Sequence, residues 1–234
     1  MNVRDHNITI GSVVAELPRA SKIFGGYGID FCCGGHKNLR AVIKEQGIAE
    51  EAIYSDLEEV QREREESYKD ISFNTMSPTV LSAYIEDRHH NYLRETLPEL
   101  AQLLATILRV HGNKHTELFE VYRLYGMLKA DLEQHLLREE TMLFPSFEEE
   151  AANQKAIAEQ SAIIIAEHEA AGEVLEKLRH ATKHYQIPKD VCGTFRKTYE
   201  LLEELEMDLH EHIHLENNIL LKNYDTRAEK NEIM

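Results

Sequence analysis

The sequence lacks the long apolar run that a membrane-spanning helix requires. Such a span needs about 20 mostly apolar residues, whereas the longest purely apolar stretch, AIIIA at residues 162–166, has five. No positively charged segment followed by an apolar one opens the sequence either. We therefore expect a cytoplasmic protein that has no membrane partner.

Cysteine is scarce, and basic residues are outnumbered. Three cysteines among 234 residues is an odd number and too few for a disulfide framework, which fits a reducing compartment. The formal net charge is -16, and no basic patch interrupts the acidic excess. A surface of this kind repels nucleic-acid phosphates and anionic lipid headgroups, so we do not expect a nucleic-acid partner.

A shift in composition near residue 74 predicts two domains. Residues 9–47 are punctuated by glycine and contain the only cysteine pair, which predicts two short helices around a glycine-rich loop. Residues 50–74 are strongly charged, which predicts a solvated helix followed by a linker. We predict an N-terminal domain over residues 1–74, a second domain over 75–224 and a flexible tail over 225–234.

The second domain lacks the two-residue alternation of a β-strand and has the period of a helix. Ser77 can cap a helix whose first residue is Pro78. Glycine, asparagine and proline then separate four predicted helices, at about 78–110, 115–149, 154–183 and 189–222. The expected fold is all-α: a small helical N-terminal domain and a C-terminal antiparallel four-helix bundle.

An internal repeat lies within the predicted bundle. Seven residues recur 77 positions later with the same chemical type: Leu128, Leu132, His135, Leu136, Glu139, Met142 and Leu143 become Leu205, Leu209, His212, Ile213, Glu216, Ile219 and Leu220. The other two helices match more weakly, through His168 and a histidine at 89 or 90. The repeat predicts two helical hairpins whose polar residues face a shared centre.

The repeated histidine and glutamate lie inside the apolar stripe of their helix. With 100° per residue, His212 and Glu216 fall within an arc of about 60° that also contains Leu205 and Leu209. A carboxylate in a core is costly unless a cation or hydrogen bonds compensate it. One such pair is more often a satisfied His–Glu hydrogen bond, but two in register favour a metal site.

The number of donors favours two metal ions over one. Four histidines and two glutamates exceed what a tetrahedral zinc site can use, whereas two octahedral ions bridged by both carboxylates use all six. Carboxylate-bridged pairs in helical bundles are typically iron or manganese, and the histidine content favours iron. Periodicity leaves the choice between His89 and His90 open. His111, at a helix end near the stripe, is either a further ligand or an ordinary capping residue.

The segment HEHIH at residues 210–214 also satisfies the H-E-x-x-H pattern of zinc proteases. That pattern would make His210 and His214 ligands and Glu211 the base. All three fall on the polar side of the predicted helix, so we interpret the match as accidental and expect these residues to face solvent.

Five short sequence motifs, spread over nearly the whole chain, resemble those of a known family. They are DFCCGG at 30–35, HHNYLRETLPEL at 89–100, HLLREETMLFP at 135–145, EHEAAGE at 167–173 and EHIHLENNILL at 211–221. Together they resemble the RIC family (repair of iron centres, the ScdA or YtfE type), which joins an ScdA_N domain to a hemerythrin-like bundle. The family's first ligand lies eight residues before the proline of LPEL, which selects His90. Some relatives have a histidine where this sequence has Leu93, a position that is not expected to bind metal.

The resemblance implies a di-iron centre, bridged by oxo and carboxylate groups, with the ligands His90, His135, Glu139, His168, His212 and Glu216. It implies a stress-protective protein that repairs iron–sulfur clusters damaged by oxidative or nitrosative stress. We expect iron donation to damaged or apo iron–sulfur proteins rather than turnover. The alternatives are an enzyme that binds and reduces nitric oxide and a hemerythrin-like sensor of oxygen or nitric oxide. The resemblance and the small first domain also suggest a homodimer.

The adjacent thiols Cys32 and Cys33 are candidates for redox chemistry or iron transfer. Their Cα atoms are about 3.8 Å apart, which is short for a disulfide, so a bridge between them would be strained. In the family context the thiols could accept iron from the bundle or contact a client protein. The alternative is that they are small residues packing a tight turn. Cys192 is expected to be structural.

Overall fold

The computed structural model describes residues 2–66 and 73–224. The predicted tail at 225–234 and part of the predicted linker lie outside these residues. The chain divides into two compact units, one formed by Met1–Leu81 with His210–Met234 and the other by Ser82–Leu209. The domain boundary at residue 74 stays a prediction. Within the described ranges, no helix is both long and apolar enough to cross a membrane.

The N-terminal part of the first unit consists of short helices around one apolar core. They are α1 (Ile10–Glu16), α2 (Ala20–Gly26), α3 (Leu39–Glu45) and α4 (Glu50–Glu66). Thr9 and Ser12 form a capping box that starts α1, and the Asn38 side chain caps α3. The glycine-rich loop lies between α2 and α3, as expected, whereas α1 is an additional helix.

The helix α4 is less solvated than its charge indicates. Ile53, Tyr54 and Leu57 are buried on one face, where they join the apolar core of α1 to α3. At about 1.5–3 kcal/mol for each fully buried large apolar side chain, these three residues fix the helix to the unit. Of its charged residues, Glu50, Glu51 and Glu59 are exposed.

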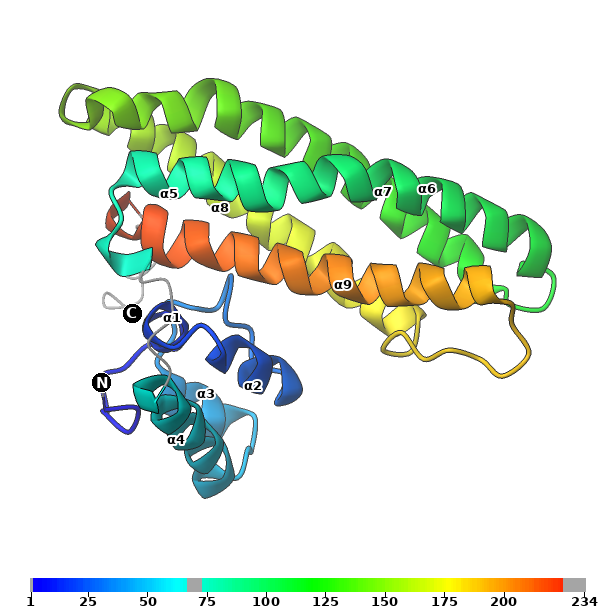
Figure 1. Cartoon of the computed structure of the whole chain (residues 1–234), viewed down its shortest axis with the longest axis horizontal. Coiled ribbons are helices and arrows are strands. Elements are labelled where there is room, and N and C mark those ends of the chain that lie inside the picture. The colour runs from blue at the N-terminus through cyan, green and yellow to red at the C-terminus, as the bar shows by residue number, and fades with distance from the viewer. Residues whose placement is uncertain (1, 67–72, 225–234) are drawn as a thin grey trace. The chain divides into compact units, whose positions relative to one another are not determined.

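The bundle consists of four long helical segments, which confirms the predicted all-α fold (Figure 1). The first combines α5 (Pro78–Ile85), η2 (Glu86–His90) and α6 (Asn91–His111), and the second combines α7 (Glu117–Arg138), η3 (Glu139–Leu143) and η4 (Phe144–Glu149). The third is α8 (Glu150–Ala181), and the fourth combines α9 (Gly193–Leu215) with η5 (Glu216–Leu220). Short 3-10 turns, η1 (Phe73–Thr75) and η6 (Lys222–Tyr224), flank them.

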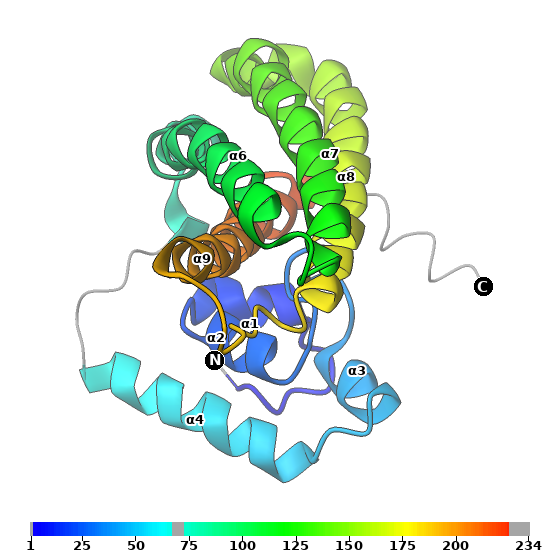
Figure 2. The ribbon, with the colours of Figure 1, turned by 90° about the vertical axis from the view of Figure 1, so that its right-hand side faces the viewer.

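The four segments match the four helices predicted from periodicity within a few residues. An end-on view shows α6, α7, α8 and α9 arranged around a common axis (Figure 2). Their facing stripes form one cluster of buried leucines and aromatic residues, including Leu97, Leu128, Tyr125 and Phe195. The apolar stripes therefore define the bundle, and the polar residues inside them are the exceptions.

Three of the four segments contain a five-residue π-helix: η2, η3 and η5. A π-helix contains one more residue per turn than an α-helix and occurs frequently at functional sites. The segments η3 and η5 begin at Glu139 and Glu216, which are the repeated glutamates, and η2 ends at His90. The 77-residue repeat therefore extends to the backbone, with an α-to-π change at the same position in each copy.

Candidate metal centre

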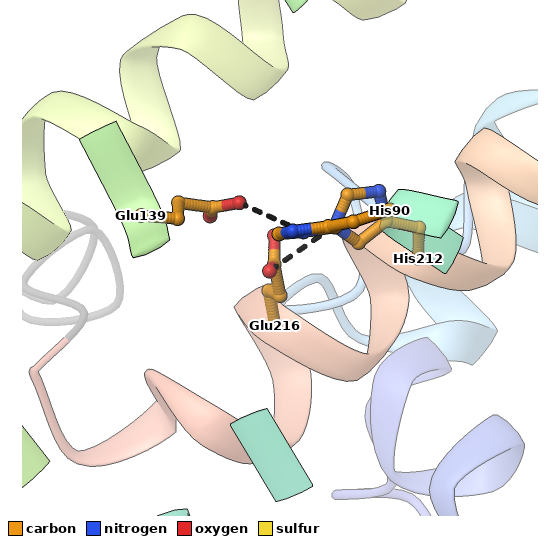
Figure 3. Close-up of side chains that lie close together, drawn as sticks. All are labelled: His90, Glu139, His212 and Glu216. Atoms are coloured by element: carbon orange, nitrogen blue, oxygen red, sulfur yellow. Dashed lines mark ion pairs between the residues drawn. The ribbon is translucent and has the colours of Figure 1, made fainter. Parts of the chain in front are cut away.

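Histidine and glutamate side chains from different helices converge in the bundle. The donor atoms of His90, Glu139, His212 and Glu216 all lie within 4.8 Å of one another (Figure 3). His90 Nε2 is 3.3 Å from Glu139 Oε2, and His212 Nε2 is 3.1 Å from Glu216 Oε1. Two imidazoles and two carboxylates thus converge on one point.

A second group shares both carboxylates with the first. His135, Glu139, His168 and Glu216 also have donor atoms within 4.8 Å of one another. His135 Nε2 is 3.2 Å from Glu139 Oε2 and 3.2 Å from His168 Nε2. Since Glu139 and Glu216 belong to both groups, each group has two histidines of its own.

All six residues are withdrawn from solvent. Glu139, Glu216 and His90 are 0% exposed, and the other three histidines are at most 4% exposed. Burial of two carboxylates is unfavourable by several kcal/mol per charge unless positive charge compensates it. The groups therefore have the donor chemistry of a cation site, and together they could hold a metal centre.

Two further carboxylates contact Nδ1 of the histidine rings, on the side of each ring away from Glu139. His90 Nδ1 is 2.7 Å from Glu140 Oε1, and His135 Nδ1 is 3.0 Å from Glu167 Oε2. Each carboxylate accepts a hydrogen bond from Nδ1–H, which leaves the Nε2 lone pair directed at the centre. The hydrogen bond from His135 is the main cause of a lowered pKa for Glu167, which Arg138 supports from 3.1 Å.

The hydrogen bonds to Nδ1 of His90 and His135 determine which atoms face Glu139, and so whether these residues fit a metal. When Nδ1 carries the proton, Nε2 of His90 and of His135 faces Glu139 acceptor to acceptor, at 3.3 and 3.2 Å. A proton or a cation between such atoms makes the contact favourable. Imidazole Nε2 and carboxylate oxygen are ligands that zinc, iron and manganese all accept in proteins. The donor set fits a multivalent cation.

His89 and His90 have different partners in the structure. His90 contributes to the first group, whereas His89 Nδ1 lies 3.1 Å from Asp208 Oδ1, in a pair where both residues are buried. Both histidines belong to the π-helix η2, so a wheel with 100° per residue cannot place them. Sequence reasoning also missed Glu140, Glu167 and Asp208. The only signal for the first two is their position beside a predicted ligand.

The expectation that His214 faces solvent is wrong. His214 is 3% exposed and its Nδ1 lies 3.4 Å from the carbonyl oxygen of Phe31, inside the first unit. Burial lowers the pKa of His214 to about 4. The wheel placed this residue opposite the bundle stripe but could not show that the cysteine loop covers that side. Neither metal-donor group contains His210, Glu211 or His214.

The cysteine pair lies in a loop organised by Asp30. Its Oδ1 accepts hydrogen bonds from the backbone N–H of Cys32 and of Cys33, both at 3.0 Å, and from the Cys32 thiol at 3.2 Å. The two sulfur atoms are 3.8 Å apart, and both residues are thiols rather than a disulfide. The hydrogen bond to Cys33, together with burial, raises the pKa of Cys32. These three residues also form a group that could hold a metal ion.

Cys192, for which we expect a structural role, is exposed. Its sulfur lies 3.2 Å from His111 Nε2, just before the first residue of α9. The backbone N–H of Phe195 and the His111 ring lower the pKa of Cys192 to about 7. His111 thus contacts a thiol and belongs to neither of the His/Glu groups.

Comparison with known proteins matches two domain families to successive parts of the chain. Residues 6–61 match the ScdA_N domain, a domain of unknown function, and residues 82–224 match the hemerythrin HHE cation binding domain. The iron-sulfur cluster repair protein YtfE of Yersinia pseudotuberculosis is 32% identical over 218 residues, which cover 92% of this chain and 95% of the relative. The iron-sulfur cluster repair protein ScdA of Staphylococcus haemolyticus is 28% identical over 217 residues, which cover 92% and 96%.

Proposed function

Because this chain belongs to the ScdA/YtfE family, in which an ScdA_N domain precedes a hemerythrin-like cation-binding bundle, we propose that it repairs damaged iron–sulfur clusters. The repair works through a di-iron centre held by His90, His135, Glu139, His168, His212 and Glu216. One observation carries this proposal: two groups of buried donors share both glutamates. Two adjacent ions can share carboxylates in this way, whereas one ion leaves two histidines unused.

The residues around the ions have separate tasks in this proposal. In a di-iron centre, the imidazoles of His90, His135, His168 and His212 and the shared carboxylates of Glu139 and Glu216 would hold the ions. Glu140 and Glu167 fix the rings of His90 and His135. Iron supplies the centre's redox and Lewis-acid chemistry. The protein contributes orientation and exclusion of bulk water, since the donors are almost completely buried.

Iron donation to a damaged or apo iron–sulfur protein is the mechanism that we favour. Metal bound through imidazoles depends on ligand protonation and exchange, so the same site can store iron and release it. The thiols Cys32 and Cys33 act as a redox or transfer pair in this scheme. The support is that Asp30, Cys32 and Cys33 place a carboxylate and two sulfurs within 4.8 Å of one another. Thiolates are ligands that accept iron.

Nitric oxide binding or reduction is the second candidate function. The observation that favours it is the number of protein ligands: each group offers four residues, fewer than the six positions of an octahedral ion. Positions are therefore left for a small diatomic ligand such as nitric oxide or oxygen. Reversible oxygen binding with retained iron would indicate the sensor instead.

Metal analysis after anaerobic purification with ferrous salt tests the centre. The expected content is near two irons per chain, lost in Glu139→Ala and Glu216→Ala and retained in Glu211→Ala, whose exposed carboxylate lies on the same helix as His212. One tightly held zinc per chain, or iron content unaffected by both glutamate variants, contradicts the proposal.

A transfer experiment separates the two mechanisms. An apo iron–sulfur protein is incubated with the iron-loaded chain, and cluster recovery is followed together with iron remaining on the chain. Donation predicts that the two change in proportion. Many turnovers of nitric oxide with all iron retained would instead support the enzyme. A cytoplasmic location and a homodimer are further parts of this proposal, and the three cysteine thiols fit a reducing compartment.

A further inference from the structure

Two of the proposed ligand histidines share a carboxylate with an arginine that reaches the protein surface. In the first case, Glu140 Oε1 accepts a hydrogen bond from His90 Nδ1 at 2.7 Å, and the same oxygen accepts one from Arg94 Nη2. The side chain of Arg94 is 43% exposed and that of Glu140 21%, whereas His90 is fully buried. These three residues, which we call the first clamp, connect the surface to the candidate metal centre.

A second clamp has the same composition. Glu167 accepts a hydrogen bond from His135 Nδ1 through its Oε2 and one from Arg138 Nε through its Oε1, at 3.0 and 3.1 Å. The side chains of Glu167 and Arg138 are partly exposed, whereas His135 is buried. His90 and His135 both face Glu139 through Nε2, so the two clamps support donors that lie on either side of one carboxylate.

Each clamp joins two helical segments beside a proposed ligand. The histidine and the arginine lie about one turn apart on one segment, and the glutamate lies on the next segment along the chain. Glu140 directly follows the proposed ligand Glu139, and Glu167 directly precedes the proposed ligand His168. A clamp therefore fixes one ligand relative to a ligand on the adjacent helix.

Stability alone gives little reason for these arginines. Ion pairs between partly exposed side chains contribute little to folding, because water screens them and both side chains lose rotamer freedom. A hydrogen bond between charged partners is directional, however, and a planar guanidinium holds a carboxylate in a defined orientation. Glu140 and Glu167 both reach solvent in part, so without the arginine either side chain can turn away from the ring. The arginine thus determines where the carboxylate lies.

The place of the carboxylate decides which nitrogen of a neutral imidazole carries the proton. Each of the two rings lies between two acceptors, Glu139 at Nε2 and either Glu140 or Glu167 at Nδ1. A carboxylate held at Nδ1 keeps the proton there and leaves the Nε2 lone pair available to a metal ion. When that carboxylate turns away, Nε2–H donates to Glu139 instead, and the lone pair that the metal needs is no longer available.

We propose that Arg94 and Arg138 are positioning residues of the metal centre, which hold Glu140 and Glu167 against the ligand histidines and preform the donor set before metal binds. This role rests on the proposed function, because the rings that the clamps orient are its proposed ligands. A preformed site loses less conformational freedom on binding, so the arginines increase metal affinity without touching the metal.

The metal-free chain provides the first test. Nitrogen NMR of isotope-labelled imidazole rings, at a pH where the rings are neutral, should find the proton on Nδ1 of His90 and of His135 in the wild-type chain. In Arg94→Gln the proton of His90 should move largely to Nε2 while His135 stays unchanged, and Arg138→Gln should give the reverse pattern. A wild-type proton on Nε2, or a proton that stays on Nδ1 in both variants, overturns the proposal.

Iron retention provides the second test. Arg94→Gln and Arg138→Gln should each lower iron affinity about tenfold in competition with a chelator, the lower end of the range for groups that contact a ligand directly. Arg94→Lys and Arg138→Lys keep a cation beside the carboxylate and should recover most of the loss. Arg123→Gln is the matched control and should bind iron normally, because Arg123 pairs with Glu120 on its own helix and is 56% exposed.

These measurements separate the role of the arginines from the di-iron function. A wild-type chain that binds no iron refutes the di-iron centre, whereas the proton positions in the metal-free chain still decide whether the clamps orient the rings. Unchanged affinity in both glutamine variants overturns the proposal even when the wild-type chain holds two irons. An equal loss in the lysine and glutamine variants also overturns it, because that result indicates lost packing rather than lost positioning by charge.

Discussion

Asn218 donates a hydrogen bond from Nδ2 to the carbonyl oxygen of Cys32 at 3.0 Å. The same amide lies 3.3 Å from the carbonyl oxygen of Phe31, which His214 also approaches to 3.4 Å. Asn218 belongs to the π-helix η5, two residues after Glu216. Within the first unit, the helical segment that carries a proposed iron ligand is thus hydrogen bonded to the loop that carries the cysteines.

Replacing Asn218 by alanine should loosen the cysteine loop. The variant removes the donor of both carbonyl contacts, so Cys32 should become accessible more often and react several times faster with iodoacetamide. Alkylation of each cysteine resolved by mass spectrometry measures this effect. Asn223→Ala, at an exposed position in the following turn, is the control and should leave the rate unchanged. Equal rates in all three proteins would show that the amide does not hold the loop.

Gly35 should not tolerate a side chain, because a Cβ at this position would overlap the side-chain amide of Asn218. We expect Gly35→Ala to reduce the free energy of unfolding by about 1–3 kcal/mol, as overpacked sites do. Gly25→Ala is the matched control, since nothing lies within 4 Å of its Cβ. Chemical denaturation measures both. The double variant Gly35→Ala with Asn218→Ala should recover part of the loss if the clash is the cause.

Neutralising the carboxylates behind the histidines should weaken metal binding without removing a ligand. Glu140→Gln and Glu167→Gln keep the shape of the side chains that contact His90 and His135 but remove their charge. We expect iron affinity to fall by about tenfold to hundredfold in each, measured by competition with a chelator. Glu159→Gln, on the exposed side of α8, should bind iron as the wild-type chain does. Unchanged affinity in the first two variants would exclude this supporting role.

Cys192 should be the most reactive thiol at neutral pH. With a pKa of about 7, roughly half of this thiol is ionised at pH 7, and the thiolate fraction falls about tenfold for each further unit of acidification. Its alkylation rate should therefore rise with pH to a plateau above pH 8, while the buried Cys32, whose pKa is raised, lags behind. His111→Ala should move the midpoint upward because it removes a hydrogen bond to sulfur. A midpoint above 8 in the wild-type chain would refute the assignment.

Much of the fold could be predicted from the sequence because the bundle follows simple periodicity. Leu128 and Leu205 occupy equivalent places in two stripes, and both are buried as that equivalence requires. The same repeat placed His135 with Glu139 and His212 with Glu216 in the candidate site from spacing alone. Repetition carried this inference, since either pair alone would have been an ordinary buried contact.

The remaining features could not be predicted, for identifiable physical reasons. A helical wheel assumes 3.6 residues per turn, so it fails within η2, where His89 and His90 take the faces that periodicity left open. Burial of His214 depends on Phe31, more than 180 residues away in the sequence, and a pattern within one helix carries no such information. In the sequence, Glu140 and Glu167 cannot be distinguished from ordinary surface charges, because the histidine rings that they contact belong to other helices.

The π-helices also bear on how the chain can change in length. Each contains one residue more than a regular α-helical turn would use, so an insertion or a deletion there shifts the phase of everything that follows by about 100°. Losing a single residue between Glu216 and Asn218 would leave both side chains present and yet turn one of them to a different side of the helix. Residue count at η2, η3 and η5 therefore constrains this protein as firmly as residue identity does.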